Sequence, residues 1–256
     1  AYAASADEAK PILTGVLLAA SENDLTLAAA DGFRLAEFRT SAEVSLREGE
    51  KTVRLIVPAR ALAYVARLCG KEGELTIKLN DGGTLAQFEV DETTIVVSLI
   101  AGAFPGYSGV IQSTVNVEGA TSVTVDVSEI EQAAKPVSVF ARDSAKVVRC
   151  ALQADPDSDN GSRALFLRGL SAESGENTSK VIAEAEGPDV VFALNVRFLR
   201  DVLRAFPTTH LRLQAAGPTA PISIVPTNGH RAVSVIMPVQ LEAEPAQAAP
   251  VADGSQ

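Results

Sequence analysis

Two stretches of this sequence carry arginine at the spacing of one helical face, which makes them candidates for contacts with phosphate groups. The arginines are Arg197, Arg200 and Arg204 in residues 192–206, and Arg60 and Arg67 in residues 56–70. Cations gathered on one surface can neutralise the phosphates of a nucleic acid. The alternative is a solvated helix face that is basic by chance, and the spacing alone leaves both interpretations open.

No pattern that could perform catalysis or hold a cofactor accompanies these arginines. The sequence contains no GxGxxG or GxxxxGK[ST] phosphate loop and no GxSxG elbow. His210 and His230 have no neighbouring Cys or His to complete a metal-ligand set. Acid pairs such as Asp91–Glu92 fall in predicted turns, where solvated surface charge is typical. We therefore expect a protein that binds without catalysing, with no catalytic residues, no metal and no cofactor.

Charge and cysteine content limit the partners and the compartment. The chain has 22 basic and 32 acidic residues and a net charge of −10, and an acidic body repels DNA. The acids concentrate in predicted strands and loops, however, so helices on one surface can still present a basic face. We expect no membrane span, no signal peptide and a cytoplasmic location. Cys69 and Cys150 are expected to be buried reduced thiols, although a disulfide between them is possible in principle.

An internal repeat positions both arginine stretches. Setting Asn195 against Pro58, 137 positions earlier, aligns Arg197 with Arg60, Leu199 with Leu62, Val202 with Val65 and Arg204 with Arg67. In the same repeat, HLRLQ (210–214) aligns with ELTIK (74–78), and AVSVIMP (232–238) aligns with TIVVSLI (94–100). The spacing predicts two amphipathic helices that bury Leu199, Val202, Leu203 and Phe206 in one copy and Leu62, Val65, Leu68 and Cys69 in the other. A helix followed by two or three strands, repeated at this distance, indicates a duplicated domain.

The rest of the pattern consists of short alternating strands, which makes the chain α+β. We predict one domain over residues 1–111, a linker over 112–121, a second domain over 122–241 and a disordered tail over 242–256. Residues 1–9 resemble the end of a helix, and residues 44–48 resemble a strand. A helix from Ser128 fits a capping box with Glu131, and Pro136 inside it predicts a kink or two short helices.

The motifs also resemble a known family. The run PILTGVLLAASENDLTLAAADGFRLAEF (11–38) closely resembles the start of the middle domain of the bacterial sliding clamp, the DNA polymerase III beta subunit. IVPARAL, AGAFPGY, the helix N-V-x-F-L-x-D-V-L and IMPVQL follow in that family's order and spacing, so the resemblance covers about residues 1–241. It implies a DNA clamp fold of two duplicated domains, each with helices on an inner, DNA-facing side and antiparallel sheets outside.

What the family does gives the expected function. The resemblance implies a processivity factor that encircles duplex DNA without sequence specificity. It would tether the DNA polymerase III alpha subunit, the clamp loader and repair polymerases through a linear peptide. The ring is usually a head-to-tail dimer of a three-domain chain, so this chain would lack a preceding domain, the first strand and part of the first helix of the middle domain. The alternatives are a two-domain clamp with three chains per ring, and a clamp-like peptide-binding scaffold that does not encircle DNA.

Carried over by position, the resemblance also implies two sets of site residues. The partner-peptide pocket would use Leu13, Gly32, Arg34, Leu35, Pro105, Val110, Asn195, Phe198, Val235, Met237, Pro238 and Val239. The DNA-facing set would be Lys10, Arg60, Arg67, Arg197 and Arg204. Phe33 stands where the family commonly has a histidine, which changes the rim of the pocket more than its floor. Each apolar member taken alone could equally be an ordinary core residue.

Overall fold

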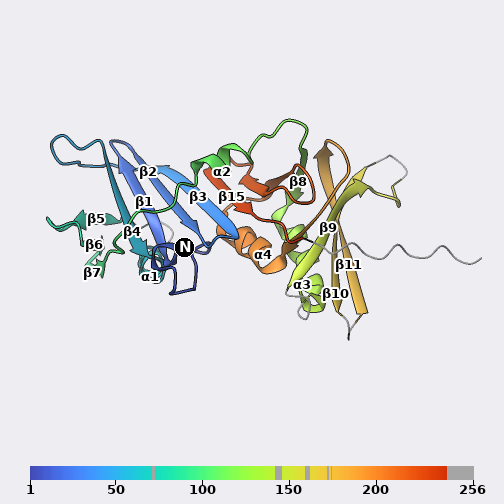
Figure 1. Cartoon of the computed structure of the whole chain (residues 1–256), viewed down its shortest axis with the longest axis horizontal. Helices are drawn as coiled ribbons and strands as arrows, with labels where there is room; N and C mark the ends of the chain where they lie inside the picture. Colours follow the sequence, from blue (N-terminus) through green and yellow to red (C-terminus); the bar gives the residue numbers. More distant parts are fainter. Residues whose placement is uncertain (71–72, 142–145, 159–161, 172, 174, 241–256) are drawn as a thin grey trace, which may run out of the picture.

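The computed structural model describes residues 1–70, 73–141, 146–158, 162–171, 173 and 175–240, which form two α+β domains (Figure 1). The first domain contains η1 (Pro11–Thr14), β1 (Gly15–Ser21), β2 (Asp24–Ala30), β3 (Arg34–Ser41), β4 (Thr52–Pro58), α1 (Ala59–Cys69), β5 (Thr76–Leu79), β6 (Leu85–Val90) and β7 (Thr93–Ser98). The second contains β8 (Thr121–Asp126), α3 (Val127–Phe140), β9 (Val147–Ala154), β10 (Arg163–Ser171), β11 (Gly175–Glu186), β12 (Val190–Asn195), α4 (Val196–Ala205), β13 (His210–Ala215), β14 (Ile222–Pro226) and β15 (Arg231–Ile236). The short helix α2 (Ser108–Gln112) lies in the connection between them. The predicted tail, 242–256, lies outside the described residues.

A single antiparallel sheet runs through both domains. Its strand order is β12-β9-β10-β11-β8-β13-β14-β15-β3-β2-β1-β4, and β5-β6-β7 form a separate sheet. The two domains join where β15 pairs with β3, in a register that sets Val235 opposite Leu35 and Ile236 opposite Arg34. This interdomain pairing, which we call the joint, brings together segments about 200 positions apart in the sequence.

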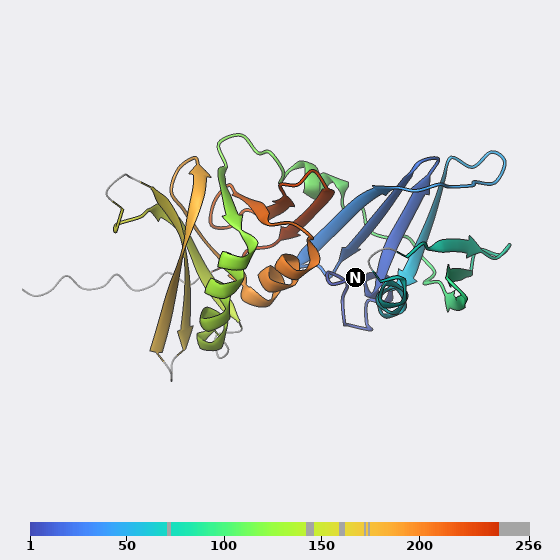
Figure 2. The same ribbon diagram turned by 180° about the vertical axis from the view of Figure 1, so that it is seen from behind.

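The longer helices share one side of the molecule. Figures 1 and 2 view the chain from opposite sides, and in both α1, α3 and α4 lie toward one long edge while α2 lies toward the other. In the second domain, α3 and α4 cover a core that includes Leu199, Val202, Leu203 and Phe206, which confirms the inward face predicted for α4. In α1, Val65 is buried, but Leu68 is 38% exposed, so its predicted inward position is wrong.

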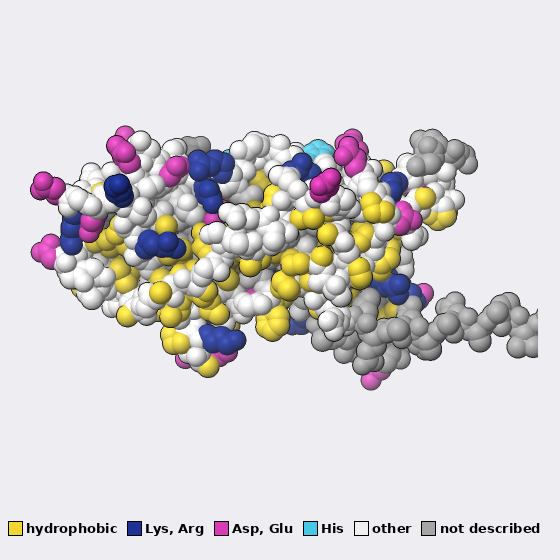
Figure 3. Space-filling model, turned by 45° about the horizontal axis from the view of Figure 1, so that its top comes forward, with side chains coloured by type: hydrophobic (Ala, Val, Ile, Leu, Met, Phe, Trp, Pro, Cys, Tyr) yellow, Lys and Arg dark blue, Asp and Glu magenta, His cyan; other side chains and the backbone are white. Residues whose placement is uncertain are grey.

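Exposed arginine side chains lie on two of the three long helices. The side chains of Arg60 and Arg67 on α1 and of Arg197 and Arg204 on α4 are exposed. The third long helix, α3, carries two glutamates and one lysine, so it does not extend the basic surface. On the side of the molecule turned forward in Figure 3, basic and acidic side chains are interspersed. Among the three long helices described, α1 and α4 therefore carry the exposed arginines.

The start of α3 differs from the predicted capping box. Asp126, not Ser128, is the N-cap residue, and its Oδ1 accepts hydrogen bonds from the backbone N–H groups of Ser128 and Glu129 at 2.7 and 3.1 Å. The hydroxyl of Ser128 and the N–H of Glu129 lower the pKa of the Asp126 carboxyl. Pro136 lies inside a single helix, so the predicted division into two short helices is wrong.

Three further segments correct the expected elements. Residues 192–195 were included in the predicted amphipathic helix of residues 192–206. They belong instead to the strand β12 (Val190–Asn195), whose side chains are mostly buried. The helix begins only at Val196, after Asn195, whose Oδ1 accepts the N–H of Arg197 at 3.0 Å. Residues 1–9 form turns in place of a helix end, and residues 44–48 form no strand. Apolar runs are compatible with either a strand or a helix, and the sheet decides between them.

Candidate partner-peptide site and DNA face

The turn that precedes β3 forms one side of the joint. Gly32 has a φ of +95°, which glycine adopts without the steric cost that other residues incur. Oδ1 of Asp31 accepts the backbone N–H groups of Phe33 and Arg34 at 2.8 and 2.9 Å. These bonds fix the backbone of the turn and leave the Phe33 side chain 65% exposed beside the joint.

Arg34 connects this turn to the second domain. Its Nε donates to Oδ2 of Asp31 at 2.9 Å, and one terminal nitrogen donates to Oδ2 of Asp201 on α4 at 2.6 Å. Its guanidinium carbon lies 4.3 Å from the centre of the Phe198 ring, within the range of a cation–π contact. Only 8% of the Arg34 side chain is exposed. Arg34 and Phe198, both predicted pocket residues, are thus direct neighbours.

The segment after β15 lies on the other side of the same turn. The N–H of Met237 donates to the carbonyl of Phe33 at 2.8 Å, and the N–H of Val239 donates to the carbonyl of Ala193 in β12 at 2.8 Å. Met237 is 41% exposed, and Pro238 and Val239 are half-buried. The predicted residues from Val235 to Val239 therefore extend from the joint to the edge of the second domain.

A small apolar cluster lies where β15 pairs with β3. Leu35, Val233 and Val235 are buried together, with Tyr107 and Ile111 packed against them from α2 and its N-cap. Burial, followed by the neighbouring Glu37 carboxylate, raises the pKa of Tyr107 to about 12. Tyr107 and Ile111 were absent from the predicted set, although such apolar residues in a Gly- and Pro-rich stretch signal a packed segment. Together these residues form an apolar cluster at the joint, on the side of α2.

Three further predicted pocket residues, Leu13, Pro105 and Val110, take no part in the contacts described above. Leu13 is half-buried in η1, Pro105 is exposed, and Val110 on α2 is 41% exposed. Asn195 is present at the joint as the cap of α4, so its observed contact is structural.

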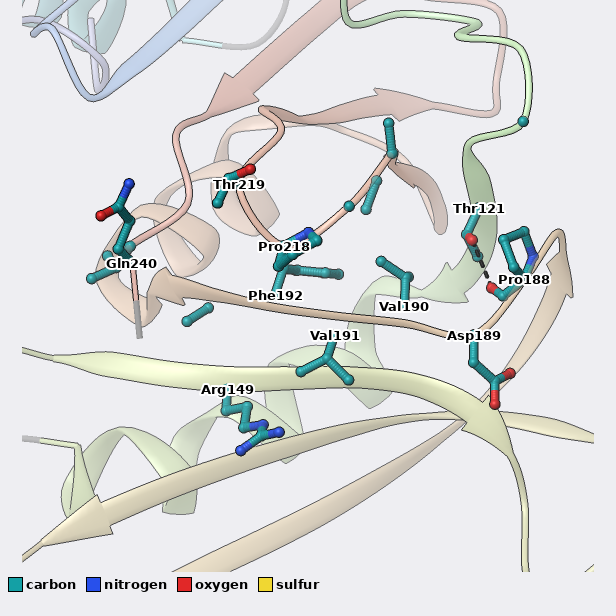
Figure 4. Close-up of a pocket in the computed structure, with 16 residues that line it drawn as sticks. Thr121, Arg149, Pro188, Asp189, Val190, Val191, Phe192, Pro218, Thr219 and Gln240 are labelled. Atoms are coloured by element: carbon teal, nitrogen blue, oxygen red, sulfur yellow. Dashed lines mark hydrogen bonds between the residues drawn. The ribbon is translucent and has the colours of Figure 1, made fainter. Parts of the chain in front are cut away.

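A hollow of about 620 Å³ lies elsewhere on the second domain (Figure 4). It is lined by Val190 and Phe192 of β12, by the loop around Pro218 and by Gln240. Val239 alone is common to this hollow and the predicted pocket. The hollow is therefore a separate feature from the group around Arg34.

The five predicted DNA-facing side chains are all exposed, on η1's N-cap, α1 and α4. The Arg67 guanidinium carbon lies 5.9 Å from the Tyr64 ring centre, and Nε of Arg204 lies 3.8 Å from a carboxylate oxygen of Glu131. Both contacts are at the surface, where ion pairs contribute little. These cations remain accessible to a polyanion.

Two family models match this chain over nearly its whole described length. The central-domain model of the DNA polymerase III beta subunit matches residues 1–106, and the C-terminal-domain model matches residues 116–240. The chain belongs to the DNA polymerase III beta subunit family. The resemblance inferred from sequence is thus confirmed, together with the clamp fold of two α+β domains.

Relatives and solved structures agree with this membership. The chain is 30% identical to the beta sliding clamp of Synechococcus elongatus over 243 residues and 28% identical to that of Synechocystis sp. over 251 residues. Each match covers 94% of this chain and 61% of the relative. The beta subunit structure from Thermotoga maritima superposes with a TM-score of 0.78 at 26% identity, covering 94% of this chain and 61% of that one. A sliding clamp structure from Pseudomonas aeruginosa gives 0.79 at 23% identity, covering 93% and 61%, which shows the fold alone.

Family membership also bears on the other sequence expectations. Clamp beta subunits are non-catalytic processivity subunits, which agrees with the absence of catalytic patterns in the sequence. Within the described residues, no group of three His, Cys, Asp or Glu side chains could hold a metal ion. No helix in the described part is long and apolar enough to cross a membrane. Cys69 and Cys150 are free thiols, half-buried and buried respectively.

Proposed function

We propose that this chain forms the middle and C-terminal part of a bacterial sliding clamp, divided at residues 1–111 and 122–241. In this role it binds a peptide of polymerases and of the clamp loader at the joint, and it lines part of a channel for duplex DNA in the cytoplasm. The observation that carries the proposal is the gathering of Arg34, Leu35, Phe198, Val235 and Met237 from distant segments at one joint.

The joint has the composition of a site for a short apolar peptide. Met237 and Phe33 are exposed at its rim, and Leu35 and Val235 are buried in the pairing of β3 with β15. Large exposed apolar side chains held by a fixed backbone favour a partner that covers them. Hydrogen bonds hold the backbone N–H groups of both Met237 and Phe33. Binding a partner would therefore cost little backbone conformational entropy at these residues.

Met237→Ala combined with Leu13→Ala tests the pocket. We expect this double variant to bind a fluorescein-labelled pentapeptide carrying leucine and phenylalanine at least tenfold more weakly, since each truncation of a buried contact costs roughly 1 kcal/mol or more. Fluorescence anisotropy measures the affinity. The control pair Leu170→Ala with Val139→Ala removes exposed apolar side chains from the same chain and should leave binding unchanged. Unchanged affinity in the Met237 and Leu13 variant would remove the pocket assignment.

The DNA channel rests on the exposed arginines of α1 and α4. The helices that carry these arginines, α1 and α4, lie toward the same long edge of the molecule as α3 (Figure 2), and the arginine side chains are exposed. Contacts of this kind would be nonspecific and would weaken as salt rises, because phosphate binding releases condensed counterions. A ring could thus slide along the duplex while its topology retains it.

Arg60→Glu combined with Arg197→Glu tests this face. We expect weaker binding to a 30-base-pair duplex at low salt, and a salt dependence whose slope falls by about 2, since each lost phosphate contact removes roughly 0.9. Arg47→Glu with Arg231→Glu is the matched control, because both side chains are more than half exposed and lie outside the helices. Equal effects of the two pairs would show that only net charge matters.

Ring closure would use the exposed sheet edges. In the described residues, β11 pairs with β8 only over Glu184–Glu186, and β7 pairs only with β6. Unpaired edges of this length can add another strand, as β3 does with β15 at the joint. We expect the full gene product to form a head-to-tail dimer, measured by light scattering. A strictly monomeric full-length protein that still binds the peptide would instead support the scaffold that does not encircle DNA.

A further inference from the structure

Arg34 was assigned to the pocket by position, yet two of its guanidinium nitrogens are hydrogen-bonded to other residues of this chain. Nε is engaged by Asp31 and one terminal nitrogen by Asp201, at 2.9 and 2.6 Å. One face of the guanidinium is covered by the Phe198 ring at 4.3 Å. With 8% of its side chain exposed, Arg34 has little surface to offer a ligand.

The two contacts on α4 constrain that helix in a specific way. Phe198 and Asp201 are three positions apart, so they lie on the same helix face. Arg34 contacts both at once, which fixes the rotation of α4 about its axis as well as its distance from β3. Charge-assisted hydrogen bonds to a planar guanidinium are directional, and a more flexible cation could not satisfy all three contacts.

The repeat supplies an internal comparison. With the separation of 137 positions, Phe198 corresponds to Ala61 and Asp201 to Tyr64 in α1. The first of these has no aromatic ring and the second has no carboxylate, and Tyr64 is 51% exposed. The contacts of Arg34 are therefore specific to the joint and are not a general property of the duplicated fold.

We infer that Arg34 is a positioning residue that, by bridging Asp31 and Asp201, holds Phe198 and the Phe33 turn in the arrangement that receives the peptide. The inference rests on the proposed function and changes the role of one residue within it. The peptide contacts Phe198, Phe33 and Met237, while Arg34 acts on it only through these neighbours. Asp201, which was absent from the predicted site, becomes the partner of Arg34.

The test uses residues 1–256 with Asp201→Asn, Arg34→Lys and the combined variant. Asparagine keeps the shape of Asp201, and Arg34 retains Asp31 as a partner. We expect each single variant to bind the labelled pentapeptide roughly tenfold more weakly, the loss typical of one charge-assisted hydrogen bond. The combined variant should lose no more than either single variant, because both remove the same bridge. Asp189→Asn is the control, since Asp189 forms an ion pair with Arg163 in the same domain and its own side chain is 65% exposed.

A second readout separates positioning from a general loss of stability. With 4-fluorophenylalanine at position 198, the fluorine resonance should shift in Asp201→Asn and Arg34→Lys without peptide and remain in place in Asp189→Asn. Urea unfolding establishes that all variants are folded at the temperature used. Wild-type affinity in Asp201→Asn, with a loss in Arg34→Lys, would overturn the inference in favour of direct contact by Arg34. Absence of binding by the wild-type chain would count against the proposed function itself.

Discussion

The helices α1 and α4 occupy equivalent places in the repeat but differ in what they bury. In α4, Val196, Leu199, Val202 and Leu203 are all buried, whereas α1 buries Val65 alone. The outer side of α4 contacts the first domain through Asp201, and the equivalent Tyr64 remains half exposed. An amphipathic helix is thus the shared property, and the proposed pocket arises only where a second domain packs against it.

The largest difference between the two domains should appear in thiol reactivity. Cys150 in β9 is 1% exposed, and burial raises its pKa to about 12, so little reactive thiolate forms near neutral pH. Cys69 at the end of α1 is half-buried. Reaction of Cys150 requires an opening that costs up to the global stability, on the order of 5–15 kcal/mol. We expect labelling of Cys69 within minutes and of Cys150 only in denaturant, followed by mass spectrometry; equal rates would contradict the burial of β9.

A core truncation in each helix should give the next largest difference. Leu199 is 1% exposed, and Leu199→Ala should lower the free energy of unfolding by about 2–5 kcal/mol. Leu62→Ala, at the equivalent position in α1, removes a half-buried side chain and should cost less. Urea unfolding followed by circular dichroism measures both. A loss at Leu62 as large as that at Leu199 would show that α1 is as firmly packed as α4.

The smallest effect is expected at the helix caps. Asp126→Ala removes the acceptor at the start of α3, while Pro58→Ala at the start of α1 removes no side-chain capping bond. Because folding lowers the pKa of Asp126, its contribution is complete above the ordinary aspartate pKa and is lost as the pH falls through the lowered value. Asp126→Ala should therefore reduce stability at neutral pH, by less than Leu199→Ala, and the difference from wild type should shrink in acid. A difference independent of pH would contradict the cap.

Local patterns accounted for much of the fold. The inward face of α4 followed from apolar residues at the spacing of one helical turn. In the structure, Gly83 and Gly229 have the positive φ that tight hairpin turns favour. The strand β12 was missed because its apolar run continues into α4 without a break, so strand and helix could not be separated by periodicity. The cap of α3 was placed two residues late because both Asp126 and Ser128 are suitable capping residues.

The sequence by itself determined where the amphipathic helices and strands form, which arginines share a helix face, and that the domain is duplicated. Only the tertiary structure decided which surfaces meet. Arg34 and Asp201 are 167 positions apart, and no local spacing relates them. Their contact depends on the pairing of β15 with β3, which fixes α4 against the turn at Gly32. Local geometry selects the elements, whereas a long-range register, set by the burial of whole faces, selects their partners.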